Sequence, residues 1–376
     1  ALDVLKRVRS DGAFAGSALR SALDRTPLSA PDRGHATELV YGVLRRQAFL
    51  DRAVRQASGK RMKDVDRPLK DILRIAAYQI MYLDRVPDHA AVSTAVDLAK
   101  KRRAGRGAGF VNAALRRLTE LPVDKRDSAP PSESDPVAHI AHVGGVARLL
   151  AERWMNDMGF EEARAFAVAS LDPAPLVLRA NLMRTSREAL MEEVGGGPGV
   201  DACAVVLPSG LRLPAGLPAV VEGRATPQDE ASMRVVSLLD PQAGESILDV
   251  CAAPGGKTTC IAERMKDEGA VVAHDRHPGR LDRVRQSAER LGLNAIEIAE
   301  ALPRTKRLFD RVLVDAPCSG LGTLRRQPEI RWRFEINDLS ELTILTVRRV
   351  GGSERGGSRH RTAHPRTPPL PRRRRV

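Results

Sequence analysis

The sequence predicts a multidomain protein with an all-α bundle, an α+β middle subdomain and an α/β domain of the doubly wound, Rossmann-like type. Over residues 1–120, apolar side chains recur at spacings of three and four, and no strand pattern interrupts them. From residue 236 onward, short apolar runs alternate with helical patterns, which is typical of a parallel sheet whose strands are joined by helices. A chain of 376 residues is long enough for two or three such domains.

The helical bundle is predicted over residues 1–120. Ile72, Ile75 and Ile80 fall on one helical face, and a second such face runs over residues 91–99. Basic residues form clusters in this segment, at Arg45-Arg46, Lys100-Lys101-Arg102-Arg103, Arg106 and Arg116-Arg117. Each cluster alone is typical of a solvated helix face, but several on one small bundle also suit the phosphates of RNA. Both interpretations stay open.

A linker is predicted over residues 121–136, because prolines and serines dominate it. Residues 137–235 are predicted to form the α+β subdomain, with a helix over 149–169, a strand over 176–179 and a glycine loop over 195–199. Trp154, Met158 and Phe166 are the expected core residues of that helix.

The α/β domain is predicted over residues 236–346. Its strands are expected at 246–250, 271–274, 295–298 and 311–314, with helices over 256–266 and 280–291. Residues 347–376 have no apolar period and contain ten arginines, no lysine and one glutamate, so that the domain is expected to lack its last strands. We interpret this stretch as an aberrant, frameshifted or disordered tail, and a genuine RNA-binding tail is the alternative.

The most specific motif is residues 248–258, LDVCAAPGGKT, which follow a predicted strand and open a helix. Small residues let the backbone approach a ligand closely, and a helix N-terminus offers unpaired N–H groups to an anion. A phosphate-binding P-loop also ends in Gly-Lys-Thr, but Cys251 stands where that motif needs its first glycine. A structural turn without a ligand is the remaining alternative.

Two further strands end in acidic residues. Asp275 follows the strand 271–274, where a carboxylate can accept hydrogen bonds from ribose hydroxyls; a simple helix cap is the alternative. The hexapeptide 315–320, DAPCSG, follows the strand 311–314 and brings the carboxylate of Asp315 and the thiol of Cys318 to one edge of the sheet. A buried structural cysteine is the alternative at Cys318.

These motifs resemble those of the RNA (cytosine-5)-methyltransferases. The segments 248–258 and 315–320 are similar to the first and fourth motifs of that family, and residues 228–232, QDEAS, also match it. Within the family, the helical segment resembles the NusB-like domain of the RsmB/Sun type, which modifies small-subunit ribosomal RNA. The resemblance covers residues 1–346, and its NusB-like part rests on residues 38–45, 73–80, 86–92 and 110–117.

The resemblance implies S-adenosylmethionine as the cofactor and ribosomal RNA as the partner. The loop that would hold the methionine end of the cofactor consists of Cys251, Ala252, Ala253, Pro254, Gly255, Gly256 and Lys257. Asp275 would hold the ribose, and Glu300 stands where the family usually has an aspartate near the adenine. Asp315 would lie beside the methyl donor and the target base. Cys318 matches the cysteine that releases the product.

The family's attacking thiol lies on a Thr-Cys segment beyond the Pro-Cys, and no cysteine follows Cys318 in this sequence. A thiolate must add to C6 of cytosine before C5 can attack a methyl group. We therefore expect no methyl transfer by residues 1–376 alone, which makes a catalytically dead RNA-binding protein one alternative. A DNA cytosine-5 methyltransferase, with the Pro-Cys thiol as the nucleophile, is the second, although the NusB-like bundle argues against DNA.

Composition excludes some classes of protein. No apolar run approaches the roughly 20 residues that a membrane helix needs, and the first residues do not read as a signal peptide. The four cysteines form no CxxC pair, which argues against a zinc site. We expect a cytoplasmic monomer without metal or membrane partner. The net charge of +14 favours a polyanionic partner only weakly, since residues 347–376 contribute +9 of it.

Overall fold

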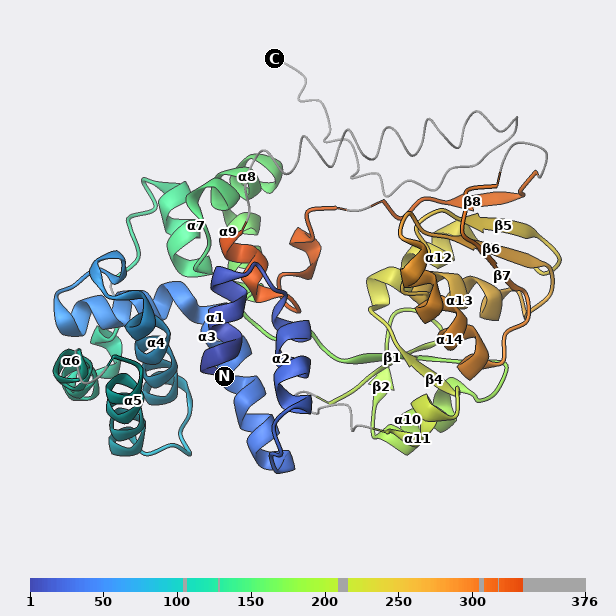
Figure 1. Ribbon diagram of the computed structural model, residues 1–376. Coiled ribbons are helices and arrows are strands. Elements are labelled where there is room, and N and C mark those ends of the chain that lie inside the picture. The colour runs from blue at the N-terminus through green and yellow to red at the C-terminus, as the bar shows by residue number, and fades with distance from the viewer. Residues whose placement is uncertain (104–106, 128, 209–215, 304–307, 317, 334–376) are drawn as a thin grey trace, which may run out of the picture. The chain divides into compact units, whose positions relative to one another are not determined.

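The computed structural model describes the chain except residues 104–106, 128, 209–215, 304–307, 317 and 334–376 (Figure 1). It forms two compact units, which we treat separately: residues 1–174 with 319–333, and residues 175–318. The predicted tail 347–376 and the last part of the predicted domain 236–346 lie outside the described residues.

The first unit begins with the predicted helical bundle. Its helices are α1 (Leu2–Ser10), α2 (Ala15–Asp24), α3 (Ala30–Ser58), α4 (Arg67–Tyr82), α5 (Asp88–Arg103) and α6 (Ala108–Glu120), with a 3-10 turn, η1 (Met62–Asp64). Helix α3 starts where the hydroxyl of Ser29 accepts the N–H of Asp32, and it ends at Gly59 with a φ of 70°. Buried Val40, Leu73 and Leu115 belong to one core shared by these helices. The helical prediction over residues 1–120 is confirmed.

Three more helices complete this part of the unit: α7 (Pro136–Gly144), α8 (Arg148–Met158) and α9 (Phe160–Ala169), after the turn η2 (Val123–Lys125). The predicted single helix over 149–169 is wrong, because Gly159 has a φ of 84° and separates α8 from α9. Trp154 is buried as expected, but Phe166 is 44% exposed, and its ring packs against that of Trp154 in a T-shaped arrangement with 5.0 Å between the centroids. Helices α7, α8 and α9 of the predicted subdomain 137–235 belong to the first unit, and its residues from 175 onward belong to the second.

Residues 319–333 return to the first unit through two 3-10 turns, η4 (Leu321–Thr323) and η5 (Pro328–Trp332). Leu324 and Ile330 join the core of α7–α9. The fully buried guanidinium of Arg331 donates to the carbonyl of Gly144 at 3.0 Å and to the hydroxyl of Ser170 at 2.8 Å. This short segment therefore closes a core that is otherwise built from residues before 174.

The second unit contains two sheets. The first is antiparallel, in the order β2-β3-β1-β4. Its elements are β1 (Val177–Ala180), α10 (Arg187–Val194), β2 (Gly197–Pro198), β3 (Ala204–Val206), α11 (Pro218–Val221) and β4 (Ala225–Pro227). The strand predicted over 176–179 lies one residue later, and the predicted glycine loop 195–199 contains β2.

The second sheet is parallel, in the order β7-β6-β5-β8. Its elements are α12 (Glu230–Leu239), β5 (Ser246–Asp249), α13 (Gly256–Arg264), β6 (Ala270–His274), η3 (Pro278–Arg280), α14 (Leu281–Leu291), β7 (Ile296–Ala299) and β8 (Arg311–Leu313). Ile247, Val271 and Leu313 share a core with residues of α12, α13 and α14, so these helices cover one face of the sheet. The predicted α/β order is confirmed, with element ends shifted by one or two residues.

Candidate active site

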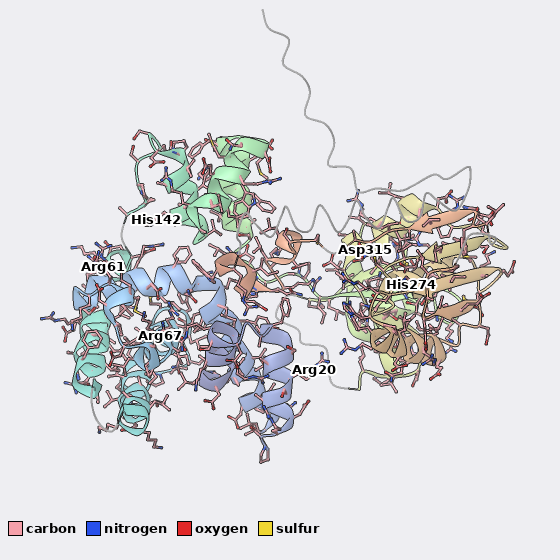
Figure 2. All side chains as sticks on the ribbon, turned by 45° about the horizontal axis from the view of Figure 1, so that its top comes forward. Arg20, Arg61, Arg67, His142, His274 and Asp315 are labelled. Carbon is pink, nitrogen blue, oxygen red and sulfur yellow. The ribbon has the colours of Figure 1, made fainter. Side chains whose placement is uncertain are left out.

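Four carboxylates lie at the carboxyl ends of the four parallel strands. Asp249 ends β5, Asp275 follows β6, Glu300 follows β7, and Asp315 comes two residues after β8. The strands are neighbours in one sheet, and their registers pair Asp249 with both Ala273 and Leu313. The four acidic residues therefore share one edge, where α/β folds bind their ligands. Figure 2 shows Asp315 together with His274, the last residue of β6, on this unit.

The turn between β5 and α13 is packed closely against α14. Gly255 has a φ of 108°, and a Cβ on it would lie 3.2 Å from the Cα of Val284. The N–H of Ala252 donates to the carbonyl of His274 at 2.8 Å, which fixes the start of the turn to the neighbouring strand. No side chain caps α13 at Gly255. The N-terminus of α13 is consequently a suitable place for an anionic group.

Asp249 was not predicted as a site residue, although it ends the strand before the turn. Its carboxylate is buried and accepts the hydroxyl of Thr258 at 2.8 Å and the N–H of Cys251 at 3.3 Å. Burial raises the pKa of Asp249 to about 6. These contacts fix both ends of the turn to one carboxyl group.

Lys257 forms an ion pair with Asp315, with 2.7 Å between Nζ and Oδ2. The pair joins the first turn of α13 to the segment that follows β8. The side chain of Asp315 is 47% exposed and that of Lys257 is 19% exposed, so the pair faces the solvent in part. Two predicted site residues thus contact each other directly.

The other predicted acidic residues differ in burial. Asp275 is buried, accepts the N–H of His277 at 3.0 Å, and faces the guanidinium of Arg280 at 3.7 Å. The bond to His277 uses Oδ1, while Oδ2 faces Arg280. Asp275 is not a helix cap, because η3 begins after His277 and α14 after Arg280, neither with a side-chain cap. Glu300 is exposed. The cofactor roles of both stay predictions.

All four cysteines are described, and Cys318 is the exposed one. Cys251 is half-buried in the turn, while Cys203 and Cys260 are buried. Burial raises the pKa of Cys203 to about 12 and also raises that of Cys260, which makes both thiols poor nucleophiles. The alternative of a buried structural cysteine at position 318 is therefore wrong.

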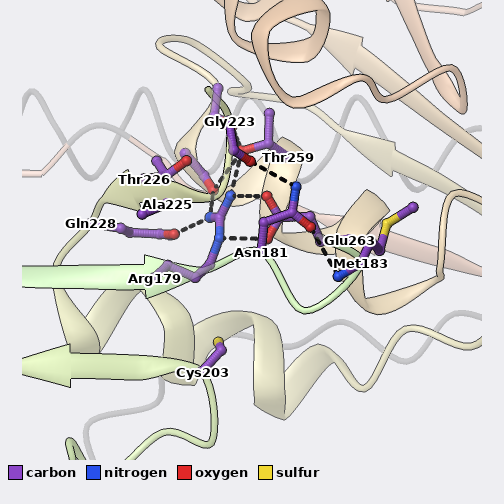
Figure 3. A network of polar contacts seen from close by, with 12 residues as sticks. Arg179, Asn181, Met183, Cys203, Gly223, Ala225, Thr226, Gln228, Thr259 and Glu263 are labelled. Carbon is purple, nitrogen blue, oxygen red and sulfur yellow. Dashed lines mark hydrogen bonds and ion pairs between the residues drawn. The ribbon is translucent and has the colours of Figure 1, made fainter. Parts of the chain in front are cut away.

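A buried arginine behind the turn was missed by sequence reasoning. Arg179 on β1 reaches Gln228, Glu263 and Thr259, as Figure 3 shows. The available signal was a charged residue directly after the apolar run 176–178, and Gln228 belongs to the QDEAS match. Its partners could not be read from the sequence, because Glu263 is 84 positions away.

The basic clusters of the bundle have different environments. Arg45 is buried and donates to the carbonyl of Arg325 at 3.2 Å. Arg45 therefore neither lies on a solvated helix face nor is available to contact RNA. Lys100, Lys101, Arg116 and Arg117 are exposed. Lys100 and Arg116 line a groove of 640 Å³ between α5 and α6. Arg106 and the side chains of Arg102 and Arg103 lie outside the described residues.

Among the residues that the structure describes, no three His, Cys, Asp or Glu side chains gather as a metal ion would require. Within the same ranges, no helix has both the length and the apolar character needed to cross a membrane.

Comparison with known proteins gives consistent matches for both parts of the chain. Residues 236–348 match the model described as 16S rRNA methyltransferase RsmB/F, and residues 1–120 match that of the NusB family. The chain is 37% identical over 342 residues to a "Probable ribosomal RNA small subunit methyltransferase B" of Synechocystis sp., covering 88% of this chain and 76% of that protein. A protein of the same name from Bacillus subtilis is 35% identical over 367 residues, covering 93% and 80%. The solved structure titled "Crystal Structure of PH0851" has the same fold, with a TM-score of 0.73 at 22% identity over 94% of this chain and 81% of that one.

Proposed function

We propose that this chain, which belongs to the RsmB/F family of 16S rRNA methyltransferases, provides the cofactor site and the base-handling residues for methylation of C5 of a cytosine in small-subunit ribosomal RNA, with S-adenosylmethionine as the methyl donor. The observation that carries the proposal is the row of four carboxylates beside the glycine-rich turn at one sheet edge. The names of the relatives support the ribosomal RNA substrate.

The residues at this edge fit the cofactor. The uncapped N-terminus of α13 suits a carboxylate, and the turn of residues 251–257 has no room for a Cβ at Gly255. The buried amide nitrogen of Gln228 has no hydrogen-bond partner among the described residues and lies 3.8 Å from the Cβ position of Gly256. Asp275 would hold the ribose and Glu300 would lie near the adenine. When bound, the cofactor supplies an electrophilic methyl group.

The exposed residues beyond β8 suit the handling of the base. Lys257 holds the carboxylate of Asp315 at the edge, where Asp315 would orient the target cytosine. Cys318 is an exposed thiol three residues further on, and it would assist loss of the C5 proton and release of the product. Attack at C6 needs another positioned thiolate, and Cys203 and Cys260 are too buried to supply it.

The proposal is tested by cofactor binding and methyl transfer together. Calorimetry with S-adenosylhomocysteine measures binding, and tritium transfer from labelled S-adenosylmethionine to unmodified small-subunit RNA measures activity. We compare residues 1–376 with the same chain extended by the C-terminal segment of the Bacillus subtilis relative. We expect binding by both proteins and transfer by the extended one, and no binding by either would overturn the proposal.

Two outcomes would select the alternatives. Binding of RNA and cofactor without transfer by either protein would favour an RNA-binding protein without catalysis. Transfer by residues 1–376 that disappears in Cys318→Ala would make Cys318 the nucleophile, and a preference for DNA over RNA would then indicate a DNA methyltransferase.

A further inference from the structure

We infer that Arg179 is a positioning residue, which fixes the cofactor-binding turn from the side of the antiparallel sheet and thereby sets the affinity for the cofactor. The inference rests on the proposed function, since it takes the turn of residues 251–257 to be the cofactor site. Figure 3 shows the side chain of Arg179 leaving β1 and ending among residues of α13 and Gln228.

The guanidinium of Arg179 has an acceptor for each of its five N–H groups. Nε donates to Oε2 of Glu263 at 2.9 Å, and Nη2 donates to Oε1 of Glu263 at 2.8 Å and to Oγ1 of Thr259 at 2.9 Å. Nη1 donates to the carbonyl of Gly256 at 2.8 Å and to Oε1 of Gln228. Because the guanidinium is planar and each of its donors has an acceptor, these contacts hold it in one orientation.

Two of these acceptors connect Arg179 to the backbone of the turn: the carbonyl of Gly256 and the hydroxyl of Thr259. Gly256 is the first residue of α13, and the hydroxyl of Thr259 donates to the carbonyl of Gly255 at 2.8 Å. Arg179 thus holds the carbonyl of Gly256 directly and that of Gly255 through Thr259. In a trans peptide the N–H points opposite to the carbonyl. Fixing these carbonyls therefore directs the N–H groups of Gly256 and Lys257 away from Arg179, to the side on which an anion can bind.

Stability alone does not explain a charged pair in this place. Arg179 and Glu263 are 1% and 7% exposed, and the loss of water around a buried pair cancels much of its attraction. An apolar pair of similar volume would fill the same space. What only the arginine provides is a fork that contacts Glu263, Gly256, Thr259 and Gln228 at once.

The test compares Arg179→Lys with a matched control, Arg311→Lys, in the full chain. Arg311 makes the same kinds of contact, to a carboxylate of Glu245 at 2.7 Å and to the carbonyl of Leu239 at 2.7 Å, but at the amino end of β8. We measure amide hydrogen exchange of residues 255–259 in the free protein, the Kd for S-adenosylhomocysteine, and Tm. Arg179→Met combined with Glu263→Gln supplies a neutral variant if the lysine variant does not fold.

We expect faster exchange over residues 255–259 in Arg179→Lys, and an affinity about tenfold weaker. At metal sites, losing a residue that supports a ligand typically weakens metal affinity about 10- to 100-fold, and we take the lower value. Arg311→Lys should lower Tm without changing either quantity. Unchanged exchange and Kd in Arg179→Lys, or an equal loss of affinity in Arg311→Lys, would overturn the inference and leave the proposed function standing. Absence of binding by the unaltered chain would overturn the proposed function, and the exchange rates would still decide whether Arg179 fixes the turn.

Discussion

The glycine-rich turn has a charged pair on each of two sides, and the pairs differ in burial and in the number of contacts. Arg179 and Glu263 are nearly inaccessible to solvent, and all donors of the arginine are paired. Lys257 and Asp315 meet through one contact of 2.7 Å, with the carboxylate half exposed. The buried pair can hold the backbone in one position, whereas the exposed pair can exchange its contact for a ligand.

The largest expected effect comes from breaking the buried pair. Glu263→Ala leaves the guanidinium of Arg179 buried without its carboxylate, which typically costs about 3–5 kcal/mol of unfolding free energy. Asp315→Ala is the control at the exposed pair and should cost no more than about 1 kcal/mol. Urea unfolding of the two variants measures the difference, and equal losses would contradict the distinction between the pairs.

The next effect concerns Asp249, which lies beneath the turn. Burial raises its pKa to about 6 in the folded chain, above the ordinary value, so the folded state binds more protons than the unfolded state between about pH 4 and 6. The unfolding free energy should therefore fall as pH rises through this window, by up to about 3 kcal/mol, and change little from this group above it.

Asp249→Asn isolates this contribution because it keeps the shape and cannot ionise. The difference in unfolding free energy between the variant and the unaltered chain should shift in favour of the variant from pH 4 to pH 7. A difference that stays constant over this range would show that Asp249 does not titrate there.

A smaller effect is expected at Asp275, on cofactor affinity. Asp275→Ala should weaken binding of S-adenosylhomocysteine by about 1–3 kcal/mol, the cost of losing a buried hydrogen-bonded carboxylate. Asp267→Ala is the matched control, since its carboxylate binds the N–H groups of Asn294 and Ala295 at 2.8 Å, before β7 begins. Calorimetry on both variants decides the matter, and equal affinity in Asp275→Ala and the unaltered chain would remove Asp275 from the site.

The smallest effect is expected from single exposed charges in the first unit. Lys100→Ala and Arg116→Ala each remove one cation from the groove between α5 and α6. If each contacts a phosphate of RNA, the slope of log affinity against log salt should decrease by about 1 per variant. Arg153→Ala is the control, because Arg153 is paired with an acidic residue of its own helix, as Lys100 is with Asp97, but lies on α8 and does not line the groove. Slopes that do not differ from that of the control would exclude this groove from RNA binding.

The sequence predicts those site residues whose place depends on the strand that they follow. It does not predict residues whose role depends on contacts with distant parts of the chain. Asp275 and Asp315 follow predicted strands, so their common edge comes from the strand pattern and the rule for parallel sheets. Glu300 was predicted from the family resemblance, and Asp249 was not predicted. The break at Gly159 was missed because one glycine inside a helical pattern gives no sign of a positive φ. Arg179 was missed for a different reason.

Buried charges are the class that a sequence hides most effectively. Arg45 stands in a basic cluster that suggests exposure, yet its side chain is buried beside Arg325, which is 280 positions away. Arg179 is one charged residue in an apolar strand of the antiparallel sheet. Its partner Glu263 lies on α13, which packs on the parallel sheet. In both cases the burial depends on contacts that no short window contains.

The return of residues 319–333 to the first unit has a consequence for the order in which the protein is made. The N–H of Ala15 at the start of α2 is satisfied by Glu329 at 2.8 Å, and the indole of Trp332 donates to the carbonyl of Leu44 at 3.1 Å. A ribosome delivers these partners only after all of residues 175–318 have been synthesised. We expect the amino-terminal unit to stay incomplete, and sensitive to protease, on nascent chains shorter than about residue 333, although domains usually fold from the N-terminus first. Pulse proteolysis of stalled chains that end before and after η5 measures this. Protease resistance of the first unit that appears only in the longer chains would confirm that its folding is completed after residues 175–318 have been synthesised.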